Sequence, residues 1–419
     1  MFRFAHLADV HLGANRDPAM EKLEIETFSR AMDICIERKV DFILICGDLF
    51  HVGIPDLTVV KEAITKMREV RQQGIPIYAI YGSHDYTPTG TSIIDIIESA
   101  GLLTNVVKGR VEDGKLKLDF VQDERTRAKL VGISARKLGL ERKYYEILDR
   151  EILEREEGFK IFAFHSGLDE FKPDYLSQME TVPISFFPRG FDYYAGGHIH
   201  DRSENNLPGY EKVVFPGPLF TGYARDLERT AKGEKRGFYI VGFDDKIASV
   251  EFVEIKLVNG VYFGYDVTGQ NSIQARKDLK DKISQLDVKG KMVVLKIRGE
   301  LSGGKTSDLN FPSLQADLLE GGAVYIHLNR FGLTSKEYTA IKAAGEDLTT
   351  IESRLFQDNI GGVNVSVRLL QSESGVKLSQ DLLRSLRGSP KTNESKRNYE
   401  VRLREDALEL LALRGALED

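Results

Sequence analysis

The sequence contains few cysteines and no long apolar run. Only two of its 419 residues are cysteines, Cys35 and Cys46, and each lies within an apolar stretch. Two such thiols indicate reduced side chains rather than a disulfide, which favours an intracellular compartment. The longest apolar runs, such as 42–46 and 161–164, are far shorter than the roughly 20 residues that a membrane-spanning helix needs. The sequence therefore predicts a protein that does not cross a membrane.

The N-terminal sequence and the charge composition narrow the expected location and function further. Residues 1–8 hold one arginine and a short strand-like run, without the apolar core and small-residue cleavage site of a signal peptide. The net charge of −6 argues against a protein that coats nucleic acid without sequence preference, although a local basic groove is compatible with it. We expect any ATP dependence to come from a partner. We expect a cytoplasmic location, or a nucleoid-associated or nuclear one.

What the chain does contain predicts several folded parts. Hydrophobic residues make up 42% and charged residues 29%, which is typical of a globular protein. Within 1–245, short β-rich runs alternate with amphipathic stretches and later runs become mainly β, so this part is expected to be an α/β domain with a second sheet. Residues 246–333 predict a small α+β domain. The remainder, 334–419, predicts a linker and C-terminal helices, interrupted by a polar segment at 388–396.

Histidine and aspartate gather where the expected strands end. The expected strands 2–8, 42–46 and 77–80 each run into a polar cluster, and two further clusters follow later strands. The polar residues of the five clusters are Asp9 and His11; Asp48 and His51; Ser83, His84 and Asp85; His165; and His198 and His200. Residues just beyond strand C-termini converge on one edge of an α/β sheet. We therefore expect these side chains to meet.

Their chemistry predicts a metal centre. Carboxylate oxygens combined with imidazole nitrogens suit manganese, iron or zinc better than magnesium or calcium. The number of ligands fits two ions, and two ions about 3.5–4 Å apart can clamp the attacking and leaving oxygens of a phosphoryl displacement. Period-two alternation at a strand end is expected to point Asp9 and His11 the same way, and the glycines before His198 and His200 permit a tight backbone. A single Asp-x-His pair is more often a surface pair, but five clusters together outweigh that interpretation.

In order and spacing, the segments AHLADVH (5–11), ICGDLFH (45–51), YGSHD (81–85), FHSG (164–167) and GGHIH (196–200) resemble the calcineurin-like metallophosphoesterase superfamily. The resemblance covers about the first 245 residues. Within the superfamily, GDLFH, the chain length and the additional domain are most similar to the SbcD-type, or meiotic-recombination, nuclease of DNA double-strand-break repair. The resemblance implies a four-layer α-β-β-α sandwich at 1–245, a DNA-binding capping domain at 246–333, and helices within 334–419 that dock on an SMC-like coiled-coil ATPase. It also implies a homodimer.

The resemblance assigns roles to individual residues. It implies two manganese ions, one held by Asp9, His11, Asp48 and His200, the other by Asp48 as a bridge together with Ser83, His165 and His198. His84 would contact the phosphate and assist the leaving oxygen, oriented by Asp85, and His51 would position the substrate or serve only as a hydrogen-bonded loop histidine. Ser83 stands where the family has asparagine. Because a hydroxyl is shorter and a poorer donor than a carboxamide, we expect the second site to be weaker or completed by water.

Other polar and apolar features leave alternatives open. His6 and His327 are expected to be core or surface histidines. Three basic clusters could follow a DNA backbone or form solvated faces: Arg136 and Lys137; Arg142 and Lys143; Lys232, Lys235 and Arg236. The apolar residues at helical spacing within 401–417 favour docking on the ATPase over packing on their own domain.

Together these features predict a manganese-dependent DNA exonuclease and endonuclease that processes the ends or hairpins of double-strand breaks. One alternative is a phosphodiesterase or phosphatase for small nucleotides, which a chain without the region after residue 245 would favour. The other is a non-catalytic scaffold in which Ser83 marks a decayed metal site. Retention of the other ligands argues against the scaffold.

Overall fold

The computed structural model describes residues 1–87, 90–136, 140–173, 176, 179–336, 348–360, 372–391, 394 and 396–411. Three predicted features therefore lie at least partly outside the described residues. They are Lys137, some residues of the polar segment at 388–396, and the end of the 401–417 stretch. The chain divides into two compact units. The first comprises Met1–Gly264, Leu286–Lys296 and Gln315–Asn329, and the second comprises Tyr265–Gln285, Ile297–Leu314 and the described residues from Arg330 onward. The boundaries expected at 245 and 333 stay a prediction.

The first large sheet carries three of the expected polar clusters. Its strand order is β16-β15-β1-β2-β3-β4, with β1 to β4 parallel and β15 and β16 antiparallel to their neighbours. The strands are β1 (Phe2–Leu7), β2 (Phe42–Cys46), β3 (Ile77–Ile80), β4 (Thr104–Asn105), β15 (Gly237–Phe243) and β16 (Ile247–Glu254). Because β16 pairs with β15, this sheet continues past residue 245.

The second large sheet carries the other two clusters. Its order is β13-β14-β12-β9-β8-β7, with β14, β12, β9 and β8 parallel. The strands are β7 (Val121–Gln122), β8 (Lys129–Ile133), β9 (Lys160–His165), β12 (Tyr193–Gly197), β13 (Ser203–Leu207) and β14 (Tyr210–Phe215). Two short ladders join β5 (Lys108–Glu112) to β6 (Lys115–Asp119), and β10 (Gly167–Leu168) to β11 (Thr181–Val182).

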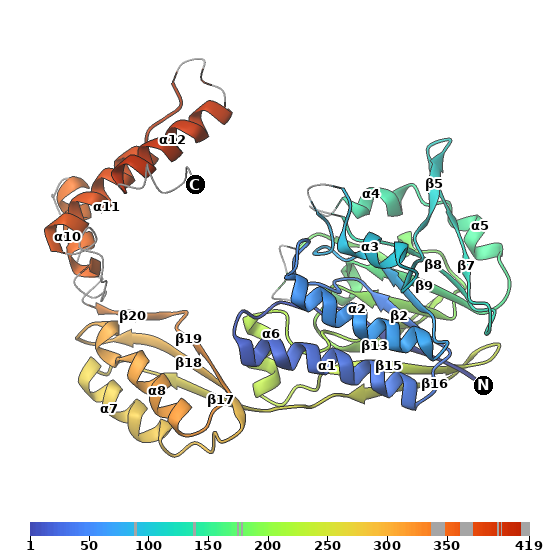
Figure 1. The fold of residues 1–419 in the computed structure, drawn as a ribbon, viewed down its shortest axis with the longest axis horizontal. Coiled ribbons are helices and arrows are strands. Elements are labelled where there is room, and N and C mark those ends of the chain that lie inside the picture. The colour runs from blue at the N-terminus through green and yellow to red at the C-terminus, as the bar shows by residue number, and fades with distance from the viewer. Residues whose placement is uncertain are drawn as a thin grey trace. The chain divides into compact units, whose positions relative to one another are not determined.

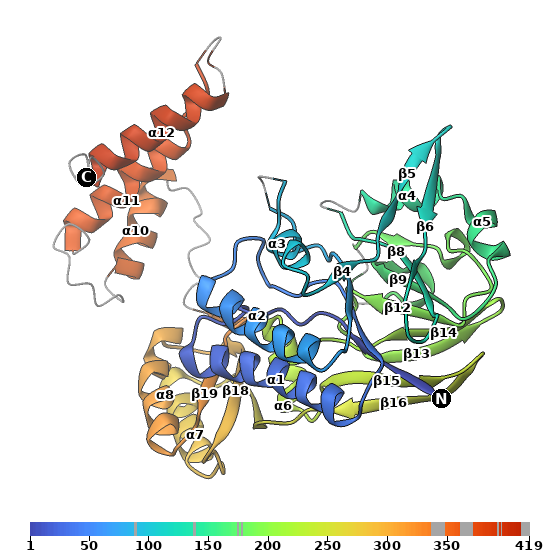
Figure 2. The same ribbon diagram turned by 45° about the vertical axis from the view of Figure 1, so that its right-hand side comes forward.

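Strand alternation builds four layers from these elements. In β1, Phe4 faces the second sheet. Its ring stacks on that of Phe42 in the neighbouring β2, with centroids 5.1 Å apart, and meets Tyr193 of the second sheet edge-on at 5.2 Å. Its neighbours Ala5 and Leu7 face the opposite side, in a core that the helices α1 (Pro18–Glu37) and α2 (Leu57–Gln72) cover. Figures 1 and 2 show α1 and α2 lying side by side along this sheet.

The outer face of the second sheet has its own apolar core. Helices α4 (Glu141–Glu146) and α5 (Arg150–Arg155) contribute Tyr145 and Leu153 to it. Two further helices, α3 (Ile93–Ser99) and α6 (Ala224–Ala231), complete this part of the chain. The order of helices, sheet, sheet and helices confirms the expected α/β class and the four-layer α-β-β-α sandwich. Both cysteines are buried and free, as expected.

Local signals explain where the long helices begin. Asp17 caps α1 by accepting hydrogen bonds from the backbone N–H groups of Ala19 and Met20, and Pro18 occupies the first turn, where its missing N–H costs nothing. The buried residues of α1, which include Phe28 and Met32, form a stripe that packs on the sheet.

The later part of the chain is α+β and then helical. It contains β17 (Asn259–Asp266), α7 (Ser272–Ile283), β18 (Lys291–Leu301), η5 (Thr306–Leu309), α8 (Phe311–Glu320), β19 (Tyr325–Asn329) and β20 (Leu333–Ser335), followed by α10 (Leu348–Ile360), α11 (Ser372–Leu386) and α12 (Lys396–Leu410). Strand β18 pairs with β19 and β20. None of the helices among the described residues combines the length and apolar character that crossing a membrane requires.

Candidate metal centre

Left-handed backbone, rather than strand alternation, orients four of the candidate ligands. Strand β1 ends at Leu7, before Asp9 and His11, whose φ angles are 49° and 51°. Asp48 and His198, also beyond their strands, have φ angles of 51° and 85°. The expected period-two argument was therefore wrong for Asp9 and His11, although both side chains do reach the same site. Such φ values cost energy outside glycine and concentrate where function requires them.

Two glycines let the loops approach each other closely. A Cβ at Gly82 would lie 2.0 Å from Asp48 Oδ1, and a Cβ at Gly197 would lie 2.1 Å from the carbonyl oxygen of Cys46. Neither position can accept a side chain unless the backbone shifts. The close approach expected from the glycines that precede His198 is therefore real.

Asp48 lies at the middle of the cluster. Its Oδ2 atom is 3.2 Å from His165 Nε2 and 3.7 Å from His11 Nε2. Its Oδ1 atom accepts a hydrogen bond from the backbone N–H of His84 at 2.9 Å. One carboxylate thus faces imidazoles from both sheets while its other oxygen is held by the backbone, which is the placement that a ligand shared between two cations needs.

Asp9 faces histidines of the second sheet. Its Oδ1 atom is 3.9 Å from His165 Nε2 and 4.0 Å from His200 Nε2, and the backbone N–H of His198 donates to both of its oxygens. His11 Nε2 and His200 Nε2 are 3.2 Å apart. Ligands about 2.1 Å from one ion and at right angles are about 3.0 Å apart, so these spacings fit the shell of a divalent cation.

The histidines from the second sheet are oriented by hydrogen bonds. His165 Nδ1–H donates to the carbonyl oxygen of Cys46 at 2.7 Å, and its buried Nε2 atom has no hydrogen-bond partner among the described residues. His200 Nδ1–H donates to Asp226 Oδ2 at 2.8 Å. Each bond leaves Nε2 directed at the carboxylates. A metal-binding histidine characteristically donates its other ring N–H in this way, so His165, with Nε2 directed at Asp48, fits a metal ligand.

The electrostatics of the cluster favour a cation. Burial raises the pKa of Asp9 to about 6, even though His165 and His200 oppose that rise. Burial alone would lower the pKa of His165, but the negative charge of Asp48, with that of Asp9, raises the pKa to about 10. The carboxylates thus hold a proton on a buried imidazole. A divalent cation among the same groups would take the place of that proton.

His84 is positioned by its neighbours His51 and Tyr223. Its Nδ1–H donates to the backbone carbonyl of His51, and its Nε2 accepts a hydrogen bond from the Tyr223 hydroxyl at 2.8 Å. The ring of His51 stacks on that of His84, with centroids 5.1 Å apart, and His51 Nδ1 lies 3.4 Å from His11 Nδ1. His51 therefore lies in the cluster, as a substrate-positioning residue would. It is also a hydrogen-bonded loop histidine, which was the alternative interpretation of this residue.

Asp85 does not orient the His84 ring, which the resemblance had suggested. Its carboxylate accepts hydrogen bonds from the backbone N–H groups of Gly82, Asp48 and Phe50 at 2.8 to 3.3 Å. It therefore ties the loop after β3 to the loop after β2. Its pKa is raised to about 7, first by burial and then by the nearby charge of Asp48.

A cavity of about 340 Å³ opens onto the cluster. It is lined by Asp48, Ser83, His84, Leu176, Met179, His198, His200, Tyr223, Arg225 and Asp226. The His198 ring lies beside that of His165, with centroids 5.2 Å apart. Ser83 and His198 therefore share the cavity with the other candidates, and their roles as ligands stay a prediction.

Sequence reasoning missed Tyr223, Arg225 and Asp226. All three lie in or just before α6, outside the five clusters, and no motif marks them. Their relation to the site depends on how α6 packs, which the local sequence does not reveal.

Arg236 has a structural role instead of contacting DNA. It is only 4% exposed, and it donates to the backbone carbonyls of Asp226 and His200. Lys232 and Lys235 pair with carboxylates at the surface. His6 is a core residue, as expected, with its Nδ1 3.0 Å from the Tyr193 hydroxyl.

Comparison with known families gives a match to the N-terminal part of the chain. Residues 2–202 match the calcineurin-like phosphoesterase family model. This part of the chain is therefore similar to that family, and the ligand geometry above fits divalent ions.

Particular relatives are DNA repair proteins. The chain is 31% identical over 265 residues to the DNA double-strand break repair protein Mre11 of Methanopyrus kandleri, a match covering 61% of this chain and 57% of that protein. It is 29% identical over 280 residues to the protein of the same name from Archaeoglobus fulgidus, covering 61% and 59%. It is also 26% identical over 308 residues to the uncharacterized metallophosphoesterase YhaO of Bacillus subtilis, covering 70% of each. The chain thus spans less than two thirds of the first two relatives.

Proposed function

We propose that this chain is a DNA nuclease that uses two manganese ions and acts on the ends of double-strand breaks. The observation that carries the proposal is the position of Asp48, whose one carboxylate oxygen faces both His165 and His11. When bound, two divalent ions would supply an activated water and neutralise charge on the phosphodiester. Mixed oxygen and nitrogen ligands favour manganese over magnesium.

The ligands divide between the two ions. Asp9, His11 and His200 lie together around one position, and Asp9, Asp48 and His165 around a neighbouring one. Asp48 is proposed as the bridge, and Ser83 and His198 as further ligands of the second ion. The hydrogen bonds that Asp226 and the Cys46 carbonyl accept from Nδ1–H turn the Nε2 atoms toward the ions, which would displace the Nε2 protons on binding.

His84 is proposed as the group that meets the phosphodiester. Its Nδ1–H is held by the His51 carbonyl, so its Nε2 is the atom that can exchange a proton with the leaving oxygen. Tyr223, which donates to that Nε2, keeps the ring turned into the cavity. His51, stacked on His84, is proposed to position the substrate.

DNA as the substrate is supported by the names of the relatives and by the domains that follow the phosphoesterase part. We also propose that the chain is an intracellular homodimer and that its C-terminal helices dock on an SMC-like coiled-coil ATPase. In α10 to α12 the apolar side chains of Leu355, Leu386 and Val401 are 41%, 64% and 49% exposed. Such exposed apolar residues are compatible with a partner surface.

The test is a manganese titration of cleavage on linear duplex DNA, single-stranded DNA and mononucleotide esters. We expect DNA cleavage that rises with manganese, and weaker activity in magnesium. Ser83→Asn should reach half-maximal activity at a lower manganese concentration if Ser83 lies at the second ion. Hydrolysis of mononucleotide esters without DNA cleavage would favour the small-nucleotide phosphodiesterase. Binding to a coiled-coil ATPase without any hydrolysis would favour the scaffold.

A further inference from the structure

A second cavity adjoins the loop that carries Ser83 and His84. Its volume is about 440 Å³, within the range of small-molecule pockets. Ser83 and His84 line the metal cavity, whereas Tyr81 and Tyr86, at the two ends of the same loop, line this second one. The proposed catalytic chemistry uses none of the side chains that line this second cavity.

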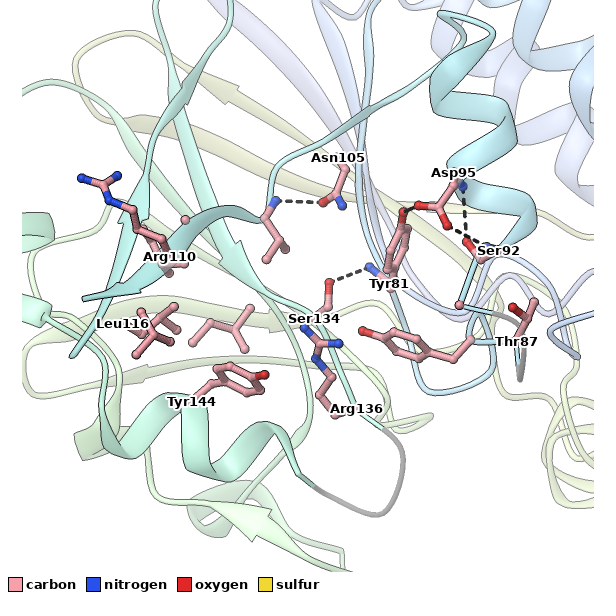
Figure 3. Close-up of a pocket in the computed structure, with 17 residues that line it drawn as sticks. Tyr81, Thr87, Ser92, Asp95, Asn105, Arg110, Leu116, Ser134, Arg136 and Tyr144 are labelled. Carbon is pink, nitrogen blue, oxygen red and sulfur yellow. Dashed lines mark hydrogen bonds between the residues drawn. The ribbon is translucent and has the colours of Figure 1, made fainter. Parts of the chain in front are cut away.

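Aromatic rings and a guanidinium form its walls. The Arg136 guanidinium lies 5.6 Å from the ring centroid of Tyr86 and 5.2 Å from that of Tyr144. The Tyr81 and Tyr86 rings meet edge-on with centroids 5.8 Å apart. Figure 3 shows Arg136 and Tyr144 close together, with Tyr81 on another wall. Flat π surfaces and a stacked guanidinium are the groups that bind planar aromatic ligands.

The cavity also favours negative charge. Its acidic residue, Asp95, is already engaged, because it accepts hydrogen bonds from the Tyr81 hydroxyl and from the Ser92 backbone in the capping box of α3 (Figure 3). Among the described residues no carboxylate forms an ion pair with the Arg136 guanidinium, and Glu141 accepts the backbone N–H of Arg136. A cation without a fixed partner is a site for a phosphate.

The floor is apolar. The side chains of Leu118 in β6 and Ile133 in β8 are 7% and 3% exposed and line the cavity. An apolar floor, tyrosine walls and an unpaired guanidinium together match a flat ring attached to an anion. A nucleotide, with its base and phosphate, has that chemistry.

The loop links this cavity to the metal centre. His84 and Tyr86 are two residues apart, so their backbones are separated by at most about 7 Å. A strand whose scissile phosphate lies at His84 therefore has its next nucleotide within reach of Tyr86. A base that is paired and stacked in a duplex cannot enter a pocket, so the nucleotide must be unpaired.

We propose that this cavity binds the unpaired nucleotide next to the scissile phosphodiester. Its base stacks against Tyr86 and Tyr144, and its phosphate contacts Arg136. The inference rests on the function proposed above, since it takes the substrate to be a DNA strand.

Binding is tested first, without metal and hence without cleavage. The probe is a single-stranded oligonucleotide with one 2-aminopurine, whose fluorescence is read easily because the chain has no tryptophan. We expect stacking to quench the probe, and Tyr144→Ala to weaken its binding about tenfold or more. Tyr144→Phe, which keeps the ring, should bind as the wild type does, and Arg136→Gln should bind more weakly. Unaltered binding by Tyr144→Ala, with its melting temperature preserved, would overturn the proposal. So would equally tight binding of the free 2-aminopurine deoxynucleotide, which would assign the cavity to mononucleotides.

Cleavage tests the position of the nucleotide. An abasic site beside the scissile phosphate should slow wild-type cleavage about tenfold. The ratio of the cleavage rate of the intact strand to that of the abasic strand should fall toward one in Tyr144→Ala. A wild-type ratio of one would overturn the inference. Bis(p-nitrophenyl) phosphate separates this outcome from failure of the proposed function. If this small diester is hydrolysed while no DNA is cleaved, the proposed nuclease function is wrong. The 2-aminopurine binding experiment alone then decides whether the cavity binds nucleotides.

Discussion

The first sheet supplies both carboxylate ligands of the candidate metal centre together with His11, whereas the second sheet supplies imidazoles. The first sheet provides both carboxylates, Asp9 and Asp48, on left-handed backbone. The second sheet provides His165 and His200, whose rings are fixed by hydrogen bonds to a backbone carbonyl and to Asp226. A carboxylate has two equivalent oxygens and needs only its backbone placed. An imidazole must also have the correct nitrogen presented, so it needs a partner for the other nitrogen.

This difference predicts where the site is most sensitive. A change to a carboxylate of the first sheet removes charge that groups from both sheets share. A change to a partner behind an imidazole of the second sheet only loosens one ligand. The following predictions test that order, from the largest expected effect to the smallest.

Asp48→Asn should have the largest effect. Asparagine tolerates the left-handed backbone at this position and can still accept the His84 N–H, but it removes the negative charge between His165 and His11. We expect DNA cleavage to fall by more than the roughly hundredfold upper limit seen when a partner behind a ligand is lost. Manganese binding, measured by calorimetry, should weaken in parallel. Asp113→Asn is the matched control, since Asp113 is exposed and also left-handed, with φ 52°. Activity within a few-fold of the wild type in Asp48→Asn would contradict the shared role.

His84→Gln should lower the catalytic rate without weakening metal binding. The ring of His84 is held by His51 and Tyr223 rather than by the carboxylate side chains. Loss of a general acid typically costs about 10²- to 10⁴-fold in rate. We expect kcat on DNA to fall within that range while manganese affinity stays constant. His327→Gln, in β19, is the control for loss of an imidazole. A parallel fall in metal affinity would instead make His84 a ligand.

Asp226→Asn should weaken one ion only. The amide can still accept the backbone N–H groups of Gly222 and Tyr223, but it no longer provides a charged acceptor for His200 Nδ1–H. A loss of about 10- to 100-fold in the affinity for one manganese ion is expected. Calorimetry should show the second ion unaffected. Asp245→Asn, at an exposed position between β15 and β16, serves as control. An equal loss for both ions would mean that the two sheets do not act separately.

The sequence predicted the strands of the first sheet well because they are continuous apolar runs. The expected strands 42–46 and 77–80 coincide with β2 and β3, and the expected convergence of their polar clusters is present. The backbone conformation of Asp9 and the role of Asp85 were not predicted, since both depend on how distant loops meet. The same holds for Asp226 and Tyr223, which reach the site through the packing of α6. The pairing of β16 with β15, which extends the first sheet past residue 245, also depends on tertiary contacts and was not predicted.

Glu24 shows how the first sheet's loop is held, and its effect should be small and dependent on pH. The side chain is 2% exposed and accepts hydrogen bonds from the backbone N–H groups of Gly13 and Asn15, just after His11. Burial raises the pKa of Glu24 from 4.5 to about 7. The hydrogen bonds from Asn15 and Gly13 lower the pKa but do not offset the effect of burial. The folded state therefore binds the proton more tightly than the unfolded state. The stability that this proton provides is present below pH 4.5 and is lost as the pH rises to about 7.

Glu24→Gln removes this titration and keeps an acceptor for the loop. The stability of the wild type relative to Glu24→Gln should therefore fall across this pH window, by at most about 1.4 kcal/mol per pH unit. Melting temperatures of the metal-free proteins, measured at several pH values in the window, provide the check. Glu26→Gln, on the exposed side of α1, is the matched control. A difference between Glu24→Gln and the wild type that is constant with pH would show that burial does not raise the pKa of Glu24. A difference that grows in favour of the wild type as the pH rises would show that a charged carboxylate holds the loop after His11.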